Sequence, residues 1–475
     1  MSARPPSPLE LLHPDGLVRS AWVAGGGCPE PVAAALPGRE GPLDLAVLAP
    51  AGAEAGDPAW LRAAARELAG ALAPDGLAVV LAPPARRAAA ARALERAGLV
   101  RAGTFLLAGR HLVSADPRAL RHALGTVLAP SARRRLAHAV APMPGGARAL
   151  AALAGGAPVL RPVGARPLLA WTRELAPGAD PDSAVLTETW RDRGGSSLVH
   201  VFGPSGAAPL AVAKVRAANG GAAHAQELAA LETVAPGARA AGVETPELIA
   251  SSRVGGRPVL LASAVPGRPA SLVPNSPGVL DRLAVWLDAW GRASAVPDGL
   301  AAAEVEERLA AGVRALAPHL PDAEAYEASL RRLAAPLPAV AAHNDLTTAN
   351  VLVAGDRIGI VDWEFATARD LPLRDLVYAT VDAHLAAGRF PSRPAAFEAC
   401  YLESGGEADA ARRHLARARA ALGLTRDAVL ACFHACWLEH AANDLRRIPA
   451  GESEFVAVAA LAAREHERLA TGLGL

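Results

Sequence analysis

The stretch from residue 341 to residue 366 constrains the fold of this chain more than any other. It carries His343, Asp345 and Asn350 in the spacing H-x-D-x-x-x-x-N, and Asp362 follows twelve residues after the asparagine. Two short apolar runs, separated by a Gly-Asp pair, lie between Asn350 and Asp362 and predict two strands of a β-hairpin. Because a hairpin returns the chain to its starting point, we expect Asn350 and Asp362 to meet.

This set of side chains suits phosphoryl transfer from ATP. The reaction needs a carboxylate that receives the acceptor hydroxyl, and it needs an amide oxygen and a second carboxylate to hold Mg²⁺ against the phosphates. We therefore assign Asp345 to the acceptor hydroxyl and Asn350 and Asp362 to Mg²⁺. The alternative that Asp345 and Asn350 only cap turns stays open, because Asx residues often do so.

The same stretch resembles the catalytic core of the aminoglycoside phosphotransferase and choline kinase-like families, which are relatives of the protein kinases. Their pattern reads H-G-D-x-x-x-x-N, followed by a short hairpin and D-W-E. Two departures are visible here: Asn344 replaces the glycine, and no Phe-Gly follows Asp362 as in a protein kinase. The second departure is normal for the small-molecule families. The resemblance implies a bilobal α+β protein kinase-like domain with ATP and Mg²⁺ as cofactors, in which His343 belongs to the catalytic residues as a brace for the loop.

A single lysine occurs in the chain, and it is Lys214; every other basic residue among the 48 Lys and Arg is arginine. Kinase-like enzymes place a lysine at this point, where it meets the α- and β-phosphates and pairs with a helix glutamate. Arginine cannot replace it there, because its planar fork is wider than an ammonium group. The resemblance places Glu227 at the pairing position, and we expect Glu232 on a solvated helix face. A solvated lysine at a strand end is the open alternative.

Two further segments are assigned to nucleotide binding by their position. Residues 191–197 form a predicted loop ahead of the lysine strand, where small residues let backbone N–H groups approach phosphate oxygens. The segment after the predicted strand 259–262 resembles the family's hinge, in which backbone groups bind adenine. The residues concerned are Gly194, Gly195, Ser196 and Ser197 in the loop, and Ser263 and Val265 in the hinge.

The length of 475 residues predicts two or three domains. We expect an α/β domain at 1–130, a connector at 131–159, a kinase-like N-lobe at 160–268 and a helical C-lobe at 269–475. Residues 1–130 alternate between predicted strands and helices, as in a partial Rossmann-like fold, and resemble the C-terminal half of a class I methyltransferase. However, the run of Gly25, Gly26 and Gly27 is not a cofactor loop of the G-x-G-x-G kind. We therefore expect a degenerate domain without catalysis, serving in protein docking or self-association.

The composition argues against several kinds of partner. The net charge is +1, with 48 basic and 47 acidic residues, so no strong field attracts nucleic acid or an anionic membrane. No run of about 18 apolar residues predicts a membrane span. Four cysteines are too few for a disulfide framework. A cytoplasmic location is the resulting expectation.

The predicted helix at 427–447 carries two groups of interest. Cys432, Cys436 and His440 recur at four-residue spacing on one face, which invites a zinc site, but no fourth ligand is evident and buried helical thiols are common. We favour core packing for these three. Because C-terminal helices supply acceptor pockets in the resembling families, Glu439, Asn443 and Asp444 are the predicted substrate contacts.

Two acidic residues follow the hairpin. Asp375 lies in a segment that closes under the active site in the resembling families, and we expect it to accept backbone hydrogen bonds. Two alternative roles stay open for Glu364: it lies near the metal, or it only braces the loop.

The prediction is an ATP-dependent phosphotransferase that transfers the γ-phosphate to a hydroxyl of an aminoglycoside-, sugar- or amino-alcohol-like small molecule. One alternative is a catalytically inactive kinase-like module that binds nucleotide or regulates a partner. The other is an S-adenosylmethionine-dependent methyltransferase, which would use the N-terminal domain.

Overall fold

The computed structural model describes residues 8–28, 38, 41–108, 111–123, 157–188, 196–206, 208–273 and 276–473. The chain forms two compact units. The first unit comprises Met1–His224 with Glu247–Ala264, and the second comprises Ala225–Pro246 with Val265–Leu475. These units divide the chain differently from the expected domain boundaries, which stay a prediction.

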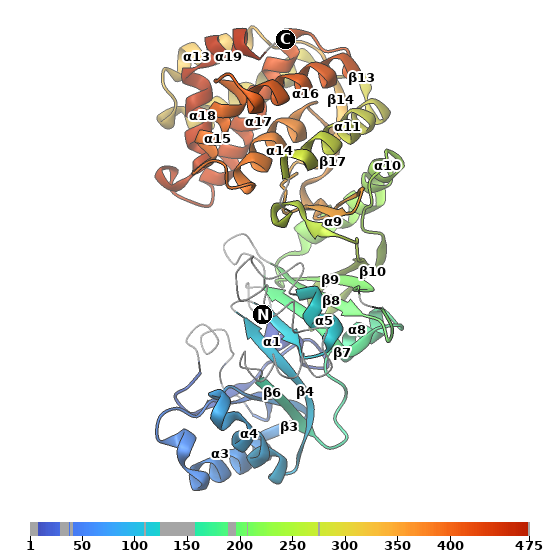
Figure 1. Cartoon of the computed structure of the whole chain (residues 1–475), viewed down its shortest axis with the longest axis vertical. Helices are drawn as coiled ribbons and strands as arrows, with labels where there is room; N and C mark the ends of the chain where they lie inside the picture. The colour runs from blue at the N-terminus through green and yellow to red at the C-terminus, as the bar shows by residue number, and fades with distance from the viewer. Residues whose placement is uncertain are drawn as a thin grey trace. The chain divides into compact units, whose positions relative to one another are not determined.

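The first unit is built on one eleven-stranded mixed sheet with the order β1-β2-β3-β6-β4-β5-β7-β8-β9-β11-β10 (Figure 1). Strands β1, β2 and β3 are parallel, and every other neighbouring pair is antiparallel. The strands are β1 Ala21–Ala24, β2 Leu43–Leu48, β3 Leu72–Val80, β4 Leu99–Ala108, β5 His111–Ser114, β6 Ala157–Pro162, β7 Asp180–Glu188, β8 Ser196–Phe202, β9 Ala211–Arg216, β10 Leu248–Val254 and β11 Arg257–Ser263.

The helices of the first unit are short apart from two. The helices are α1 Pro8–Leu11, α3 Pro58–Ala71, α4 Pro84–Arg96, α5 Pro117–His122 and α8 Ala170–Leu175, and α9 Gly221–Thr233 starts in this unit and ends in the second. Helices α3 and α4 pack against each other; α3 lies on the parallel strands β2 and β3, and α4 lies mainly on β6 and β4. Both begin with proline, which suits the first turn because its N–H group would have no partner there. The α/β class expected for this part is confirmed.

The sheet does not stop where the N-terminal domain was expected to end. Strand β6, which begins inside the expected connector, inserts between β3 and β4. Strand β5 then pairs with β7, with Leu112 opposite Leu186, so the expected N-lobe strands continue the same sheet. An unpaired edge on β5 would expose a row of backbone N–H and C=O groups, and pairing with β7 satisfies them. Most of the expected connector, residues 131–156, lies outside the described residues.

The glycine run after β1 forms a tight turn that packs against the end of β2. Gly25 has φ +94°, and a Cβ atom there would lie 2.5 Å from the carbonyl oxygen of Ala49. The N–H of Gly27 donates to the same oxygen at 2.7 Å, and the N–H of Gly26 donates to Glu54 Oε2 at 3.3 Å. These glycines therefore permit close packing, and two of their N–H groups are used inside the fold.

The second unit is mainly helical, and Figure 1 shows its later helices gathered in one bundle. Its helices are α10 Ala235–Ala240, α11 Ser276–Ser294, α12 Ala302–Leu316, α13 Ala323–Arg331, α14 Arg374–Ala386, α15 Arg393–Tyr401, α16 Gly406–Leu422, α17 Arg426–Leu445, α18 Glu454–Arg464 and α19 His466–Gly472. Two small sheets have the orders β12-β15-β16 and β13-β14-β17. Their strands are β12 Arg268–Pro269, β13 Val296–Leu300, β14 Leu337–Ala342, β15 Val351–Ala354, β16 Arg357–Ile360 and β17 Thr367–Asp370.

Helix α17 runs through the core of this unit, which explains its cysteines. Cys432 and Cys436 are fully buried among apolar side chains, and the Cys436 thiol donates to the Arg374 carbonyl oxygen at 3.6 Å. His440 stacks on Phe455, with ring centroids 5.4 Å apart. Across the described residues no cluster of His, Cys, Asp and Glu has the arrangement of a metal site. Both thiols are thus packed in the core, as the sequence favoured.

Within the described part of the chain, no helix combines the length and the apolarity needed to cross a bilayer.

A buried histidine in the same core predicts sensitivity to acid. His434 is fully buried, and its ring nitrogens form hydrogen bonds with the Tyr326 hydroxyl (2.8 Å) and the His466 ring (3.0 Å). Burial lowers the pKa of His434 to about 3. Because an unfolded histidine has a pKa of about 6.5, protons bind the unfolded chain preferentially, and stability that is complete above pH 6.5 is lost below it at about 1.4 kcal/mol per pH unit.

We therefore expect His434 by itself to lower the free energy of unfolding by about 2 kcal/mol between pH 6.5 and pH 5. Urea titrations followed by circular dichroism at a series of pH values measure it. His434→Gln should flatten the pH dependence, and the same change at the exposed His319 should not. An equal slope in wild type and His434→Gln would contradict the assignment.

Candidate active site

The predicted hairpin forms and brings the two metal-ligand candidates together. Strands β15 and β16 pair antiparallel with Val351 opposite Ile360, and Gly355 takes φ +65° in the turn between them. The Val361 N–H donates to the Asn350 carbonyl oxygen at 3.0 Å, which extends the hairpin by one bond. Asp362 follows directly, so it lies beside Asn350 as the spacing predicted.

Asp345 lies against this pair. The amide nitrogen of Asn350 donates to the carbonyl oxygen of Asp345 at 2.9 Å and to its Oδ2 at 3.1 Å. Burial, aided by the charges of Asp362 and Glu364, raises the pKa of Asp345 to about 7. The three carboxyl groups therefore lie within electrostatic reach of one another, and a carboxyl whose pKa is this high can accept a proton near neutral pH.

The donor atoms around Asp345 suit a hard divalent cation. Because the Asn350 amide nitrogen is held by Asp345, its amide oxygen is the atom that remains for a metal. Asp362 has φ +68° and ψ 62°, a left-handed conformation that non-glycine residues seldom adopt. An amide oxygen with one or two carboxylates is a set that Mg²⁺ accepts, so the residues fit the ion. Glu364, on the next turn, is partly exposed.

His343 is a brace. It is fully buried, and its Nε2 donates to the Val361 carbonyl oxygen at 3.1 Å while its Nδ1 accepts from the Asp345 N–H at 3.4 Å. Its ring meets Trp363 edge to face, with centroids 5.0 Å apart. Burial lowers the pKa of His343. With both ring nitrogens engaged, the neutral ring fixes the loop and has no nitrogen left to carry a proton for an acceptor.

Asp375 supports the loop from the first turn of α14. Its Oδ2 accepts from the His343 N–H at 2.7 Å and its Oδ1 from the Asn344 N–H at 2.8 Å, which confirms the prediction that it binds backbone groups. Burial raises the pKa of Asp375, and the hydrogen bonds from the backbone N–H groups of His343 and Asn344 oppose this shift. Asn344 has φ +66°, which explains why asparagine can stand where glycine was expected, since it tolerates this conformation better than most residues. Its side chain also donates to Asp370 Oδ2 at 2.8 Å.

Asp382 is a supporting residue that the sequence analysis missed. Its Oδ2 accepts from both the backbone N–H and the hydroxyl of Thr348, each at 2.7 Å. It stands seven residues after Asp375 on α14, which places both carboxyl groups on one helix face. One helix thus holds the chain on either side of Asp345, and the D-x-x-x-x-x-x-D spacing was the available signal.

The predicted nucleotide contacts lie in several elements. Lys214 is in β9, flanked by Leu198 of β8 and Leu260 of β11. Glu227 is a buried residue of α9, and its pairing with Lys214 stays a prediction. The hydroxyl of Ser263 accepts from the Glu247 N–H at 2.9 Å. Val265 packs against Gly359, where a Cβ atom would clash at 2.2 Å.

The predicted phosphate loop needs a correction at one end. Ser196 and Ser197 are buried strand residues, paired with Arg216 and Val215, because β8 starts two residues earlier than expected and its pairing with β9 includes them. Gly194 and Gly195 lie outside the described residues.

The three predicted substrate contacts have different surroundings. Glu439 forms an ion pair with the buried Arg374. Asp444 is buried, and its Oδ2 accepts from the Ser453 hydroxyl at 2.6 Å, at the start of α18. Asn443 is exposed. The carboxylates of Glu439 and Asp444 are therefore engaged in holding the helices together, and the three residues stay only a prediction as substrate contacts.

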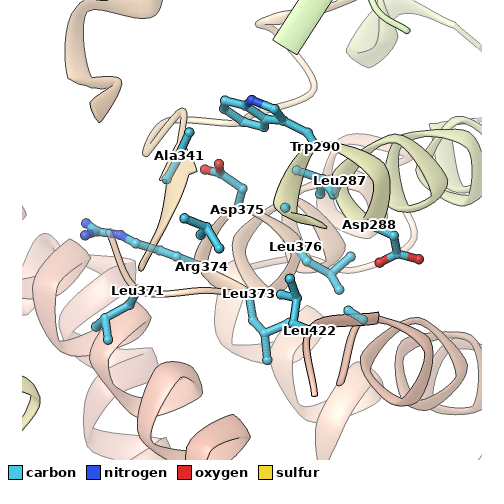
Figure 2. A pocket seen from close by; sticks show the side chains of 14 residues that line it. Leu287, Asp288, Trp290, Ala341, Leu371, Leu373, Arg374, Asp375, Leu376 and Leu422 are labelled. Atoms are coloured by element: carbon cyan, nitrogen blue, oxygen red, sulfur yellow. The ribbon is translucent and has the colours of Figure 1, made fainter. Parts of the chain in front are cut away.

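A small cavity of about 40 Å³ lies behind the supported loop (Figure 2). Asp375 and Arg374 of α14 line it together with Asp288 and Trp290 of α11. A volume of this size holds one or two water molecules. The cavity is therefore too small to be the substrate pocket.

Comparisons with known proteins agree with this site. Residues 211–415 match the phosphotransferase enzyme family. No curated protein sequence matches the chain. The family match begins at residue 211 and lends no support to the methyltransferase resemblance expected for residues 1–130.

Solved structures that resemble the chain include a glucosamine kinase at 18% identity, with 57% of this chain and 75% of that chain covered and a TM-score of 0.35. For an aminoglycoside 2'-phosphotransferase-IIIa in complex with GDP, the identity is 14%, 58% of this chain and 89% of that chain are covered, and the TM-score is 0.36. An aminoglycoside phosphotransferase from Streptomyces rimosus, in complex with ADP and streptomycin, has 18% identity, 50% and 88% coverage and a TM-score of 0.34.

The predicted α/β class is confirmed, because the chain has one large mixed sheet and many helices. Asp345, Asn350 and Asp362 all lie inside the segment 211–415 that matches the model of the phosphotransferase enzyme family.

Proposed function

We propose that this chain is an ATP-dependent phosphotransferase that transfers the γ-phosphate to a hydroxyl of a small molecule. The observation that carries the proposal is the meeting of Asp345, Asn350 and Asp362 at the base of one hairpin, inside the segment that matches the family. Nothing in this set suits nucleophilic catalysis by a thiol or a serine, because the reacting groups are carboxyl and amide oxygens.

The residues divide the work of the reaction. Asp345 orients the acceptor hydroxyl and takes its proton late, which its raised pKa favours. Asn350 and Asp362 would hold Mg²⁺, which would neutralise charge on the phosphates. Lys214, with Glu227, holds the α- and β-phosphates. Because the transition state is loose, positioning and charge neutralisation supply most of the catalysis.

The segment after Asp362 favours a small acceptor over a protein. Trp363 is fully buried and donates to the Ile360 carbonyl oxygen at 3.0 Å. Strand β17 begins at Thr367 and pairs with β14 at once, so only a short turn separates it from Asp362. The chain has no room there for the long activation loop that protein kinases use to bind peptides. Family relatives named for glucosamine and aminoglycosides support the same class of acceptor.

Phosphotransfer by the purified full-length chain tests the proposal. With Mg·ATP and a panel of sugars, amino sugars, amino alcohols and aminoglycosides, we expect one class to gain a phosphoryl group in mass spectrometry. Binding of ATP without transfer to any hydroxyl compound would favour the inactive kinase-like module. Heat on titration with S-adenosylmethionine would favour the methyltransferase alternative, for which the turn at Gly25–Gly27 offers no support.

A further inference from the structure

Three aromatic rings and one guanidinium group gather beside the catalytic loop. Tyr378 of α14, His440 of α17 and Phe455 of α18 lie with ring centroids 4.2, 5.4 and 5.9 Å apart. Arg393, the first residue of α15, lies over two of these rings, 4.5 Å from the Phe455 centroid and 5.5 Å from that of Tyr378. His440 and Phe455 are only half-buried, so solvent reaches this ring cluster.

Two buried polar atoms in the ring cluster lack partners among the residues that the structure describes. They are Nη1 of Arg393 and Nε2 of His440. The other terminal nitrogen of Arg393, Nη2, donates to Asp382 Oδ1 at 3.5 Å. A buried charged donor without an acceptor is costly, so Arg393 Nη1 needs an acceptor, which a bound ligand would supply.

The ring cluster is tied to the proposed catalytic residue. Asp382 contacts Arg393 with one oxygen and Thr348 with the other, and Thr348 stands three residues after Asp345. Burial raises the pKa of Tyr378, the charge of Arg393 lowers it, and the charges of Asp345 and Asp382 raise it further. A molecule resting on the rings would therefore lie next to the loop that holds Asp345.

We propose, on the basis of the proposed function, that the ring cluster and Arg393 form the acceptor site and that the acceptor carries a carboxylate. Arg393 Nη1 donates to that carboxylate, and an apolar face of the acceptor packs on Phe455 and His440. The nearby carboxylates of Asp382 and Asp345 repel a doubly charged phosphate more strongly than a singly charged group, so a hydroxy acid is favoured.

Matched pairs of acceptors test this site. Galacturonate and galactose differ by one carboxylate, and glucosamine offers a cationic comparison. We expect the wild-type chain with Mg·ATP to phosphorylate galacturonate with a kcat/KM at least about tenfold above that of galactose or glucosamine. Arg393→Gln should lower the kcat/KM for galacturonate about 10- to 100-fold more than it lowers that for galactose, because only the acid loses a charge-assisted hydrogen bond.

Two further variants separate recognition from support of the loop. Arg393→Lys keeps the charge and should recover part of the preference for the acid. Arg389→Gln is the matched control, because Arg389 is an exposed arginine that pairs with Glu407 at 2.9 Å. If Arg393 only supports Asp382, Arg393→Gln will lower the kcat/KM of acid and neutral sugar by the same factor, and the proposal falls.

Calorimetry distinguishes failure of this site from failure of the proposed function. Galacturonate should bind the wild-type chain in the presence of a nonhydrolysable ATP analogue, and Arg393→Gln should abolish the heat. If galacturonate binds to the wild-type chain but not to Arg393→Gln, and no acceptor is phosphorylated, the site stands and the proposed phosphotransferase activity is wrong. Equal or tighter binding of galactose or glucosamine, or no binding of galacturonate, would overturn the proposed site even in an active enzyme.

Discussion

Replacement of Asp345 by alanine or asparagine is expected to lower kcat by about 10²- to 10⁴-fold, the range for a lost general base, and to leave the affinity for ATP nearly intact. The carboxyl can take a proton near neutral pH because burial and the charges of Asp362 and Glu364 raise its pKa to about 7. Asparagine keeps an oxygen that can accept from Asn350 Nδ2, and alanine does not. If the alanine variant loses more metal affinity than the asparagine variant, Asp345 also holds Asn350 in place for the metal, in addition to taking the proton.

Steady-state kinetics with saturating Mg·ATP and the acceptor found in the screen measure the effect. Asp356→Asn is the matched control, because this exposed aspartate lies at the tip of the same hairpin and should leave kcat unchanged. Turnover in Asp345→Asn equal to that of the wild type would remove Asp345 from the mechanism.

Replacement of Asp375 by alanine should reduce both stability and turnover. Two buried N–H groups, those of His343 and Asn344, would lose their acceptors, which lie 2.7 and 2.8 Å away. Each unsatisfied group costs about 1 to 3 kcal/mol. Removal of the buried carboxylate, which is itself poorly solvated, offsets part of this cost. We therefore expect the free energy of unfolding to fall by about 2 to 4 kcal/mol. Because Asp345 follows directly, displacement of the loop by about 1 Å should lower kcat about 100-fold.

Urea unfolding followed by tryptophan fluorescence and kcat measured below the transition test this pair of effects. Asp288→Asn is the control, because Asp288 lines the same cavity as Asp375 and pairs with Arg417 without touching the catalytic loop (Figure 2). Asp288→Asn should lower the free energy of unfolding and leave kcat unchanged. Full stability and full activity in Asp375→Ala would show that the loop holds its shape without this carboxylate.

Short-range features of this chain were predictable. The segment Leu43–Leu48 forms a strand, Gly98 follows α4 with φ +97°, and Phe105 of β4 pairs with Ser114 of β5. The catalytic hairpin followed from the same rules, because a Gly-Asp turn between two apolar runs sets the register. These features depend on neighbours within about a dozen residues.

Features that join distant segments were not predictable. The insertion of β6 between β3 and β4 and the continuation of the sheet from β5 into β7 depend on which edges are free once the other strands have paired. On α17, the periodic pattern could not show that Glu439 would pair with Arg374 or that Asp444 would bind Ser453. The partner of a charged side chain on a helix is decided by the element packed against it.

The sequence alone determined which side chains meet at the candidate site: His343, Asp345, Asn350 and Asp362 come together because a short hairpin and local turns place them. The tertiary structure decided what supports and surrounds these groups. Asp382 meets Thr348, and Arg393 meets Phe455, only because α14, α15 and α18 pack together, and contacts of that kind arise from the filling of a core whose members are far apart in the chain.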